Sequence, residues 1–161
     1  MLKNKGFTLL EAMIVIFLIG IMAAYAVPNF LKWRANANLI GSVGNLVGDL
    51  QKAKIMAIKE NHSVVIDYSA TENSYVIFVD NGEGDDGIEG DKERNGEERL
   101  VTHGKLGAGV TFQDINYPGD HVRFTSRGRS SNGDVKLINS AGKIRQVGTT
   151  NTGKIEVEKP N

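Results

Sequence analysis

The stretch from residue 6 to residue 31 decides the fold, and it reads GFTLLEAMIVIFLIGIMAAYAVPNFL. As an α-helix, Phe7 to Leu31 would be about 37 Å long, against about 30 Å for the hydrocarbon core of a bilayer. Glu11 is the one charged residue in this apolar run. A carboxylate is costly inside a membrane, so Glu11 is a candidate functional residue.

Two ordinary explanations compete for this N-terminus. A secretory signal peptide also has a basic start and an apolar stretch, and a cleavage site is imaginable at Ala23-Ala24-Tyr25-Ala26. The length of the apolar run and the interruption by Glu11 argue against a signal peptide. A plain membrane anchor, with Glu11 lying in the head-group zone, is the other alternative.

The residues Gly6-Phe7-Thr8-Leu9-Leu10-Glu11, followed by the apolar helix and Pro28, resemble the N-terminus of type IV pilins and type II secretion pseudopilins. The resemblance implies that a prepilin peptidase cuts between Gly6 and Phe7 and that the new N-terminus at Phe7 is methylated. Residues 1–6 would then be a cleaved leader. Pro28 stands where family members commonly carry a helix-bending proline.

The charges around the apolar run predict its orientation and its role in assembly. Lys3 and Lys5 favour a cytoplasmic N-terminus, so the C-terminal part should face outward. Together with this orientation, the resemblance implies a single-pass inner-membrane protein whose C-terminal part is periplasmic or extracellular and which is incorporated into a filament. After cleavage, the Phe7 amine becomes a cation next to an apolar helix. In a filament, an unpaired Glu11 would be expensive, and a Phe7 amine of the same or a neighbouring subunit can neutralise it.

Composition limits the remaining functions. The 161 residues carry zero formal net charge and include no cysteine, which excludes a disulfide framework, a thiolate metal site and a cysteine nucleophile. The three histidines, His62, His103 and His121, have no metal-ligand spacing. No nucleophile elbow and no phosphate-binding glycine loop occurs, so we do not expect an enzyme.

Beyond Pro28, a helical pattern continues to residue 60. Its apolar positions follow spacings of three and four, typical of an amphipathic helix. They are Leu39, Val43, Leu46, Val47, Leu50, Ala53, Ala57 and Ile58. Pro28 should kink or loosen the helix without ending it, and Asn61-His62 should end it. Gly41, Gly44 and Gly48 lower the helix propensity, and they fit either close approach of a neighbour or a loosely packed helix.

The rest of the chain predicts short strands, rich in Val, Ile and Tyr and separated by turn residues. The expected strands are 63–68, 74–79, 99–102, 110–113, 122–125, 135–138, 143–147 and 154–157, with a hairpin turn at 139–142. The fold class is therefore α+β, with a long N-terminal transmembrane or stalk helix packed on a C-terminal antiparallel β-sheet domain. The resemblance implies that this domain is of the pilin type. The expected division is leader 1–6, membrane or filament-core helix 7–31, amphipathic helix 32–60 and β-rich head 61–161.

An acidic, glycine-rich segment from residue 80 to residue 98 is a weak candidate for calcium binding. Oxygen ligands separated by glycines can wrap a hard cation, and Asp80, Asp85 and Asp86 are the candidate ligands. The segment does not match the spacing of an EF-hand loop, and a solvated loop between strands is the simpler interpretation. No other cofactor is expected.

A basic bias from residue 121 to residue 154 is the second surface feature. If Ile144 and Val147 mark the buried side of their strand, Lys143 and Arg145 share the outer face, and Lys136 joins them when Val135 and Leu137 point inward. With Arg123 and Arg127, this arrangement predicts a positive stripe that holds phosphates. Few aromatic residues lie nearby, so readout of bases is not supported.

The later residues are similar to the GspH/FimT group of minor pilins and pseudopilins. The similar parts are the strand end Phe78-Val79-Asp80, the segment Asn95 to Leu100 and Gly142-Lys143-Ile144-Arg145. The resemblance implies a minor filament subunit of a type IV pilus or a type II secretion pseudopilus. Its partners would be other pilins, the prepilin peptidase and an inner-membrane assembly platform.

The resemblance also implies an alternative function. Some FimT-like members bind DNA through a Gly-Arg-x-Arg segment and act as receptors in natural transformation. Lys143 replaces the first arginine here, which keeps the charge and loses the forked geometry of a guanidinium. The possible DNA contacts are Arg123, Arg127, Lys143 and Arg145. The acidic segment is also longer than expected for the group.

Overall fold

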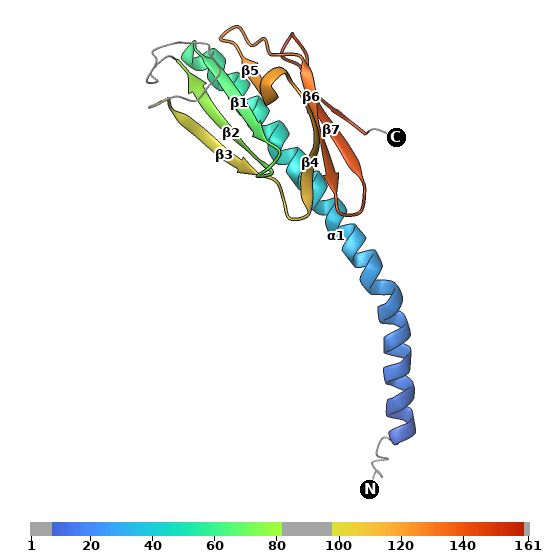
Figure 1. The fold of residues 1–161 in the computed structure, drawn as a ribbon. Helices are drawn as coiled ribbons and strands as arrows, with labels where there is room; N and C mark the ends of the chain where they lie inside the picture. Colours follow the sequence, from blue (N-terminus) through green and yellow to red (C-terminus); the bar gives the residue numbers. More distant parts are fainter. Residues whose placement is uncertain (1–7, 82–97, 160–161) are drawn as a thin grey trace. The chain divides into compact units, whose positions relative to one another are not determined.

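The computed structural model describes residues 8–81 and 98–159. The chain divides into two compact units, Met1–Arg34 and Ala35–Asn161, called here the N-terminal and C-terminal units. One helix, α1 (Leu9–Glu60), contributes to both (Figure 1). The predicted hairpin turn, helix end and strands are all present, and the α+β fold class is confirmed.

Helix α1 begins and ends at residues whose chemistry explains the boundary. The Thr8 hydroxyl accepts a hydrogen bond from the Glu11 backbone N–H at 3.3 Å, as an N-cap residue does. Pro28 lies inside the helix, as expected, and the Asn29 side-chain amide donates to the Tyr25 carbonyl at 3.0 Å. The helix ends before Asn61, which adopts a left-handed conformation with φ of 59°.

Eight strands form two antiparallel sheets in the C-terminal unit. The first sheet has the order β3-β2-β1-β5 and the second β4-β6-β7-β8. The strands are β1 (Ser63–Ser69), β2 (Ser74–Asp80), β3 (Leu100–Lys105), β4 (Val110–Asn116), β5 (His121–Phe124), β6 (Gly133–Asn139), β7 (Ile144–Thr149) and β8 (Ile155–Glu158).

The division into two sheets is a finding that the strand pattern did not predict. Strands β4 and β5 follow one another in the sequence but belong to different sheets. The short 3₁₀ turn η1 (Pro118–Asp120) joins them, and Gly119 and Asp120 adopt φ angles of 71° and 59°. These left-handed conformations turn the chain away from β4 before β5 pairs with β1.

Both sheets pack on the second half of α1 to form one hydrophobic core. Leu46 and Leu50 of the helix are fully buried, as are Ile66 of the first sheet and Leu137 of the second. Ile58, predicted to share the buried face, is 51% exposed. Every residue of this core lies between Leu39 and Val147, so the fragment Ala35–Asn161 contains its own complete core.

Candidate functional site

The N-terminal unit presents apolar side chains that nothing in the described chain covers. Ile16 and Phe17, for example, are 69% and 68% exposed. Among the described residues, α1 is long and apolar enough at this end to cross a membrane. Burying such a surface is strongly favourable, and exposed apolar patches of this kind typically mark sites of membrane or protein interaction.

Glu11 lies in the first turn of α1, and its position has a local explanation that the sequence analysis did not use. Thr8 caps the helix, and Glu11 stands three residues later, which is the spacing of a capping box. A carboxylate at this position also interacts favourably with the helix dipole. The Thr-x-x-Glu pattern was visible in the sequence.

The expected processing residues, Gly6 and Phe7, lie outside the described residues.

Of the three calcium candidates, the structure describes Asp80 alone. Asp80 is fully buried at the end of β2, where it pairs with Ser63 of β1. Asp85 and Asp86 lie outside the described ranges. Within residues 8–81 and 98–159, no group of three or more His, Asp or Glu side chains is placed to hold a metal ion.

The four basic candidates do not form one site, because they lie at opposite ends of the C-terminal unit. Lys143 donates its backbone N–H to Asn139 Oδ1, and the Asn139 side chain donates to Asn36 near the start of the unit. The turn that carries Arg127 lies beside Ile58, since a Cβ added to Gly128 would come within 3.1 Å of its Cδ1. Asn36 and Ile58 are separated by about 33 Å along α1.

The predicted outer face for Arg145 is also wrong. Arg145 pairs directly with Leu137, and residues directly opposite in an antiparallel pair share a face of the sheet. Leu137 is fully buried, so Arg145 lies on the core-facing side, where it is half-buried. The prediction assigned Ile144 and Val147 to one face, whereas a strand alternates every residue.

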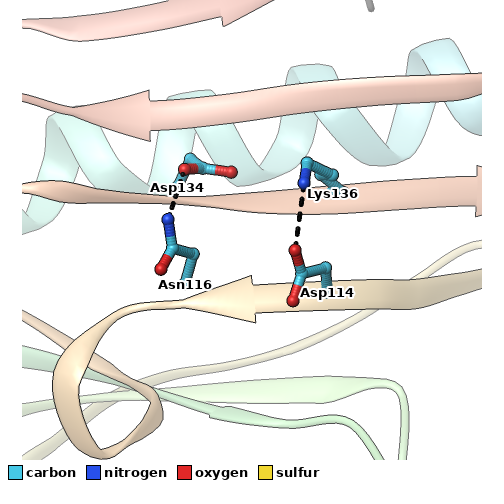
Figure 2. A network of polar contacts seen from close by, with 4 residues as sticks. All are labelled: Asp114, Asn116, Asp134 and Lys136. Carbon is cyan, nitrogen blue, oxygen red and sulfur yellow. Dashed lines mark hydrogen bonds and ion pairs between the residues drawn. The ribbon is translucent and has the colours of Figure 1, made fainter.

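Lys136 lies on the opposite, outer face of the second sheet, where it is paired. Its Nζ lies 3.0 Å from Asp114 Oδ2, and Asn116 donates to Asp134 in the adjacent contact (Figure 2). The hydrogen bond and charge of Asp114 raise the pKa of Lys136. Gln146 pairs with Lys136 on one side and with Glu158 on the other, so this face is mixed in charge and the positive stripe is absent from it.

Three arginines instead gather at the other end of the unit, around the turn that follows β5. Arg123, Arg127 and Arg129 line a hollow of about 490 Å³. The other lining residues are Thr125, Ser126, Ser130 and Ser131. We call this feature the arginine hollow. Arg129 was not among the contacts predicted from the sequence.

Backbone hydrogen bonds fix the shape of the arginine hollow. Gly128 N–H donates to the Thr125 carbonyl at 2.8 Å, and Gly128 has a φ of 73°, a conformation that favours glycine. The Ser130 hydroxyl donates to the Thr150 carbonyl at 2.8 Å. A Cβ on Gly153 would lie 1.9 Å from the Gly128 carbonyl oxygen, so the 125–129 and 150–153 turns are in close contact.

Comparison with known proteins identifies the family. The model of type II transport protein GspH matches residues 42–153, and the prokaryotic N-terminal methylation motif matches residues 1–27. The chain belongs to the GspH family. This confirms the resemblance predicted from Gly6–Glu11 and from the later residues, and it identifies a structural subunit of the pilin and pseudopilin type.

Similar proteins agree with this assignment. The type IV major pilin protein PilA of Myxococcus xanthus (strain DK1622) is 50% identical over 44 residues, which cover 27% of this chain and 20% of that pilin. The chain spans about half or less of the length of the curated relatives it matches first.

Two solved structures share the fold. The minor pseudopilin EpsH from the type 2 secretion system of Vibrio cholerae has a TM-score of 0.56 and 11% identity, covering 74% of this chain and 95% of EpsH. The type IV minor pilin FimU of Pseudomonas aeruginosa (strain PAO1) has a TM-score of 0.57 and 14% identity, covering 78% of this chain and 92% of FimU.

Proposed function

We propose that the protein is a minor pilin or pseudopilin, a structural subunit of a type IV pilus or a type II secretion pseudopilus and not an enzyme. The carrying observation is the combination of the methylation motif with a helix whose apolar side chains are left uncovered by the described residues. Members of this family assemble with other pilins in filaments, and the membrane-anchored helix is the part that such assembly would cover.

Processing would prepare the helix for this role. A prepilin peptidase would remove residues 1–6 and the Phe7 amine would be methylated, on the cytoplasmic side of the inner membrane. The C-terminal unit would then face the periplasm or the exterior. In a filament, the Phe7 amine of the same or an adjacent subunit would neutralise Glu11, because an unpaired carboxylate among apolar helices is costly.

The substitution Glu11→Gln tests the assembly role. Gln also functions at the third position of a capping box, so this variant keeps the helix start and removes the charge. We expect normal cleavage after Gly6 and loss of most incorporation into filaments. Cleavage is measured by intact mass of the membrane-bound protein, and incorporation by immunoblot of sheared filaments from cells that carry the matching assembly system.

Thr8→Ala is the matched control, because it removes the helix cap and leaves the Glu11 carboxylate. Loss of an N-cap costs about 0.5–2 kcal/mol of helix stability, which a filament with many helix contacts can absorb. We therefore expect Thr8→Ala to assemble. If Glu11→Gln assembles normally while Thr8→Ala does not, Glu11 serves the helix cap and the pairing with the Phe7 amine is refuted.

A further inference from the structure

The arginine hollow is a site for which the proposed assembly function gives no role. Three arginine residues line this one concavity, and no carboxylate residue lines it. Three other surface cations of the described chain have anionic neighbours: Lys136 has Asp114, Lys154 has Glu156 and Arg99 has Glu60. Within the described ranges, none of the three arginines of the hollow forms an ion pair.

We propose that the arginine hollow binds a phosphate group, and specifically a terminal, dianionic one. Three positively charged residues around one hollow repel one another, and a bound anion reduces that cost. A guanidinium presents a planar fork of donors that matches the oxygens of phosphate, and it stays charged at every relevant pH. A terminal phosphate offers three oxygens and up to two charges, whereas a diester within a nucleic acid strand offers two oxygens and one charge.

The walls of the hollow are held in place before any ligand binds. Arg123 N–H donates to Ser131 Oγ at 3.3 Å, and Ser131 N–H donates back to the Arg123 carbonyl at 3.1 Å. Arg129 Nε lies 3.5 Å from the Asn151 carbonyl, which leaves its terminal nitrogens available. The Ser126 hydroxyl has no hydrogen-bond partner in the described chain and lies at the hollow, where it can donate to an oxyanion.

No tyrosine, phenylalanine or tryptophan lines the hollow, so it has no surface on which bases could stack.

The inference is independent of the proposed assembly function, because it uses residues of the C-terminal unit alone. It also differs from the predicted stripe, since Lys143 and Arg145 lie at the other end of that unit. The ligand group has two available sources, a soluble phosphate compound or the terminal phosphate of a lipid such as phosphatidic acid.

The test uses the fragment Ala35–Asn161, which contains the complete core. Inorganic phosphate is titrated at pH 7.5 and constant ionic strength while amide and arginine Nε–H signals are followed by NMR. We expect saturable shifts at Arg123, Arg127 and Arg129. The double variant Arg127→Gln, Arg129→Gln should lose about tenfold or more in affinity, as expected when charge-assisted hydrogen bonds are removed.

The matched control is the double variant Lys143→Gln, Arg145→Gln, which removes the same charge at the other end and should retain affinity within about twofold. Amide spectra of both variants are recorded to check that they remain folded. Equal losses in the two variants, or shifts that do not saturate, would overturn the proposal. Stronger binding of an oligonucleotide without terminal phosphates than of inorganic phosphate would also overturn it.

The source of the phosphate is distinguished with vesicles. The fragment is sedimented with phosphatidylcholine vesicles that contain or lack phosphatidic acid. Co-sedimentation that requires phosphatidic acid, Arg127 and Arg129 supports a lipid headgroup. Phosphate-induced shifts without such co-sedimentation support a soluble phosphate compound. Absence of both responses contradicts the proposed site.

Discussion

The two halves of α1 are comparably helical, and they differ in what covers their apolar side chains. In the first half, Ile16 and Phe17 are mostly exposed. In the second half, Leu46 and Leu50 are fully buried in the core that the helix forms with both sheets. Hydrophobicity alone would rank the first half as the better core, so burial here follows from available partners and not from composition.

This difference assigns the two halves to different kinds of contact. The second half buries its apolar face against strands of the same chain, and so contributes to folding of the C-terminal unit. The first half leaves its apolar surface exposed within the described chain, where the proposed function places contacts with a membrane or with neighbouring helices. Substitutions of buried residues in the second half should therefore change folding, and substitutions in the first half should leave it unchanged.

The largest expected effect is that of Leu46→Ala. Removing a fully buried leucine side chain leaves a cavity, and such changes typically cost about 2–5 kcal/mol. We expect the free energy of unfolding of the fragment Ala35–Asn161 to fall by this amount in urea denaturation followed by circular dichroism.

Two matched variants sharpen this result. Ile55 lies on the same helix and is 65% exposed. Ile55→Ala should therefore change the free energy of unfolding by less than about 0.5 kcal/mol. Ile16→Ala in the full chain in detergent should leave hydrogen exchange of the strands unchanged. Faster exchange in the strands of Ile16→Ala would show that the first half supports the core, and the comparison would fail.

Local patterns in the sequence were sufficient for most of the fold. The eight strands lie where runs of Val, Ile and Tyr predicted them, because a half-buried strand has a period of two. The helix end at Asn61 and the hairpin turn at 139–142 follow from residues that tolerate or favour left-handed backbone, and Gly142 has a φ of 79°. These features depend on neighbours in the sequence.

The features that sequence analysis missed depend on contacts between distant segments. The helical pattern predicted that Ile58 is buried, but Ile58 is exposed. Spacing within a helix carries no information on how far along it the sheets extend. The arginine hollow forms because β5 pairs with β1 and the following turn contacts the 150–153 turn. The prediction for Arg145 was wrong because it placed Ile144 and Val147 on one face. Residues three apart in a strand lie on opposite faces.

An intermediate effect is expected from the tyrosines of the core at alkaline pH. Burial raises the pKa of Tyr68 well above its ordinary value of 10.0, and the nearby Tyr117 and Tyr75 raise it further. The unfolded state loses this proton near pH 10 while the folded state retains it. The contribution of Tyr68 to stability is therefore constant below pH 10 and falls above it, by about 1.4 kcal/mol per pH unit.

Urea denaturation of the fragment at pH 9, 10 and 11 measures this slope. Burial also raises the pKa of Tyr75 and Tyr117, so they contribute in the same direction. Tyr68→Phe should make the slope shallower at little cost at pH 7, because the buried Tyr68 hydroxyl has no hydrogen-bond partner in the described chain. Tyr25→Phe, at a 74% exposed position of the first half, should leave the alkaline response of the C-terminal unit in the full chain unchanged.

The smallest effect separates the two halves by glycine substitution. A Cβ added to Gly44 or to Gly20 meets no atom within 4 Å, so alanine fits at both positions. Gly44→Ala should stabilise the C-terminal unit by about 0.5–1 kcal/mol, because alanine loses less conformational entropy in a helix. Gly20→Ala in the full chain should leave the stability of that unit unchanged, since its helical segment contributes nothing to the core.

Gly104→Ala should instead destabilise the same fragment, because its Cβ would lie 2.1 Å from the buried Tyr75 ring. Thermal melts followed by circular dichroism rank the variants, and a destabilised Gly44→Ala would mean that the solvent face of α1 is already in contact with something within the unit.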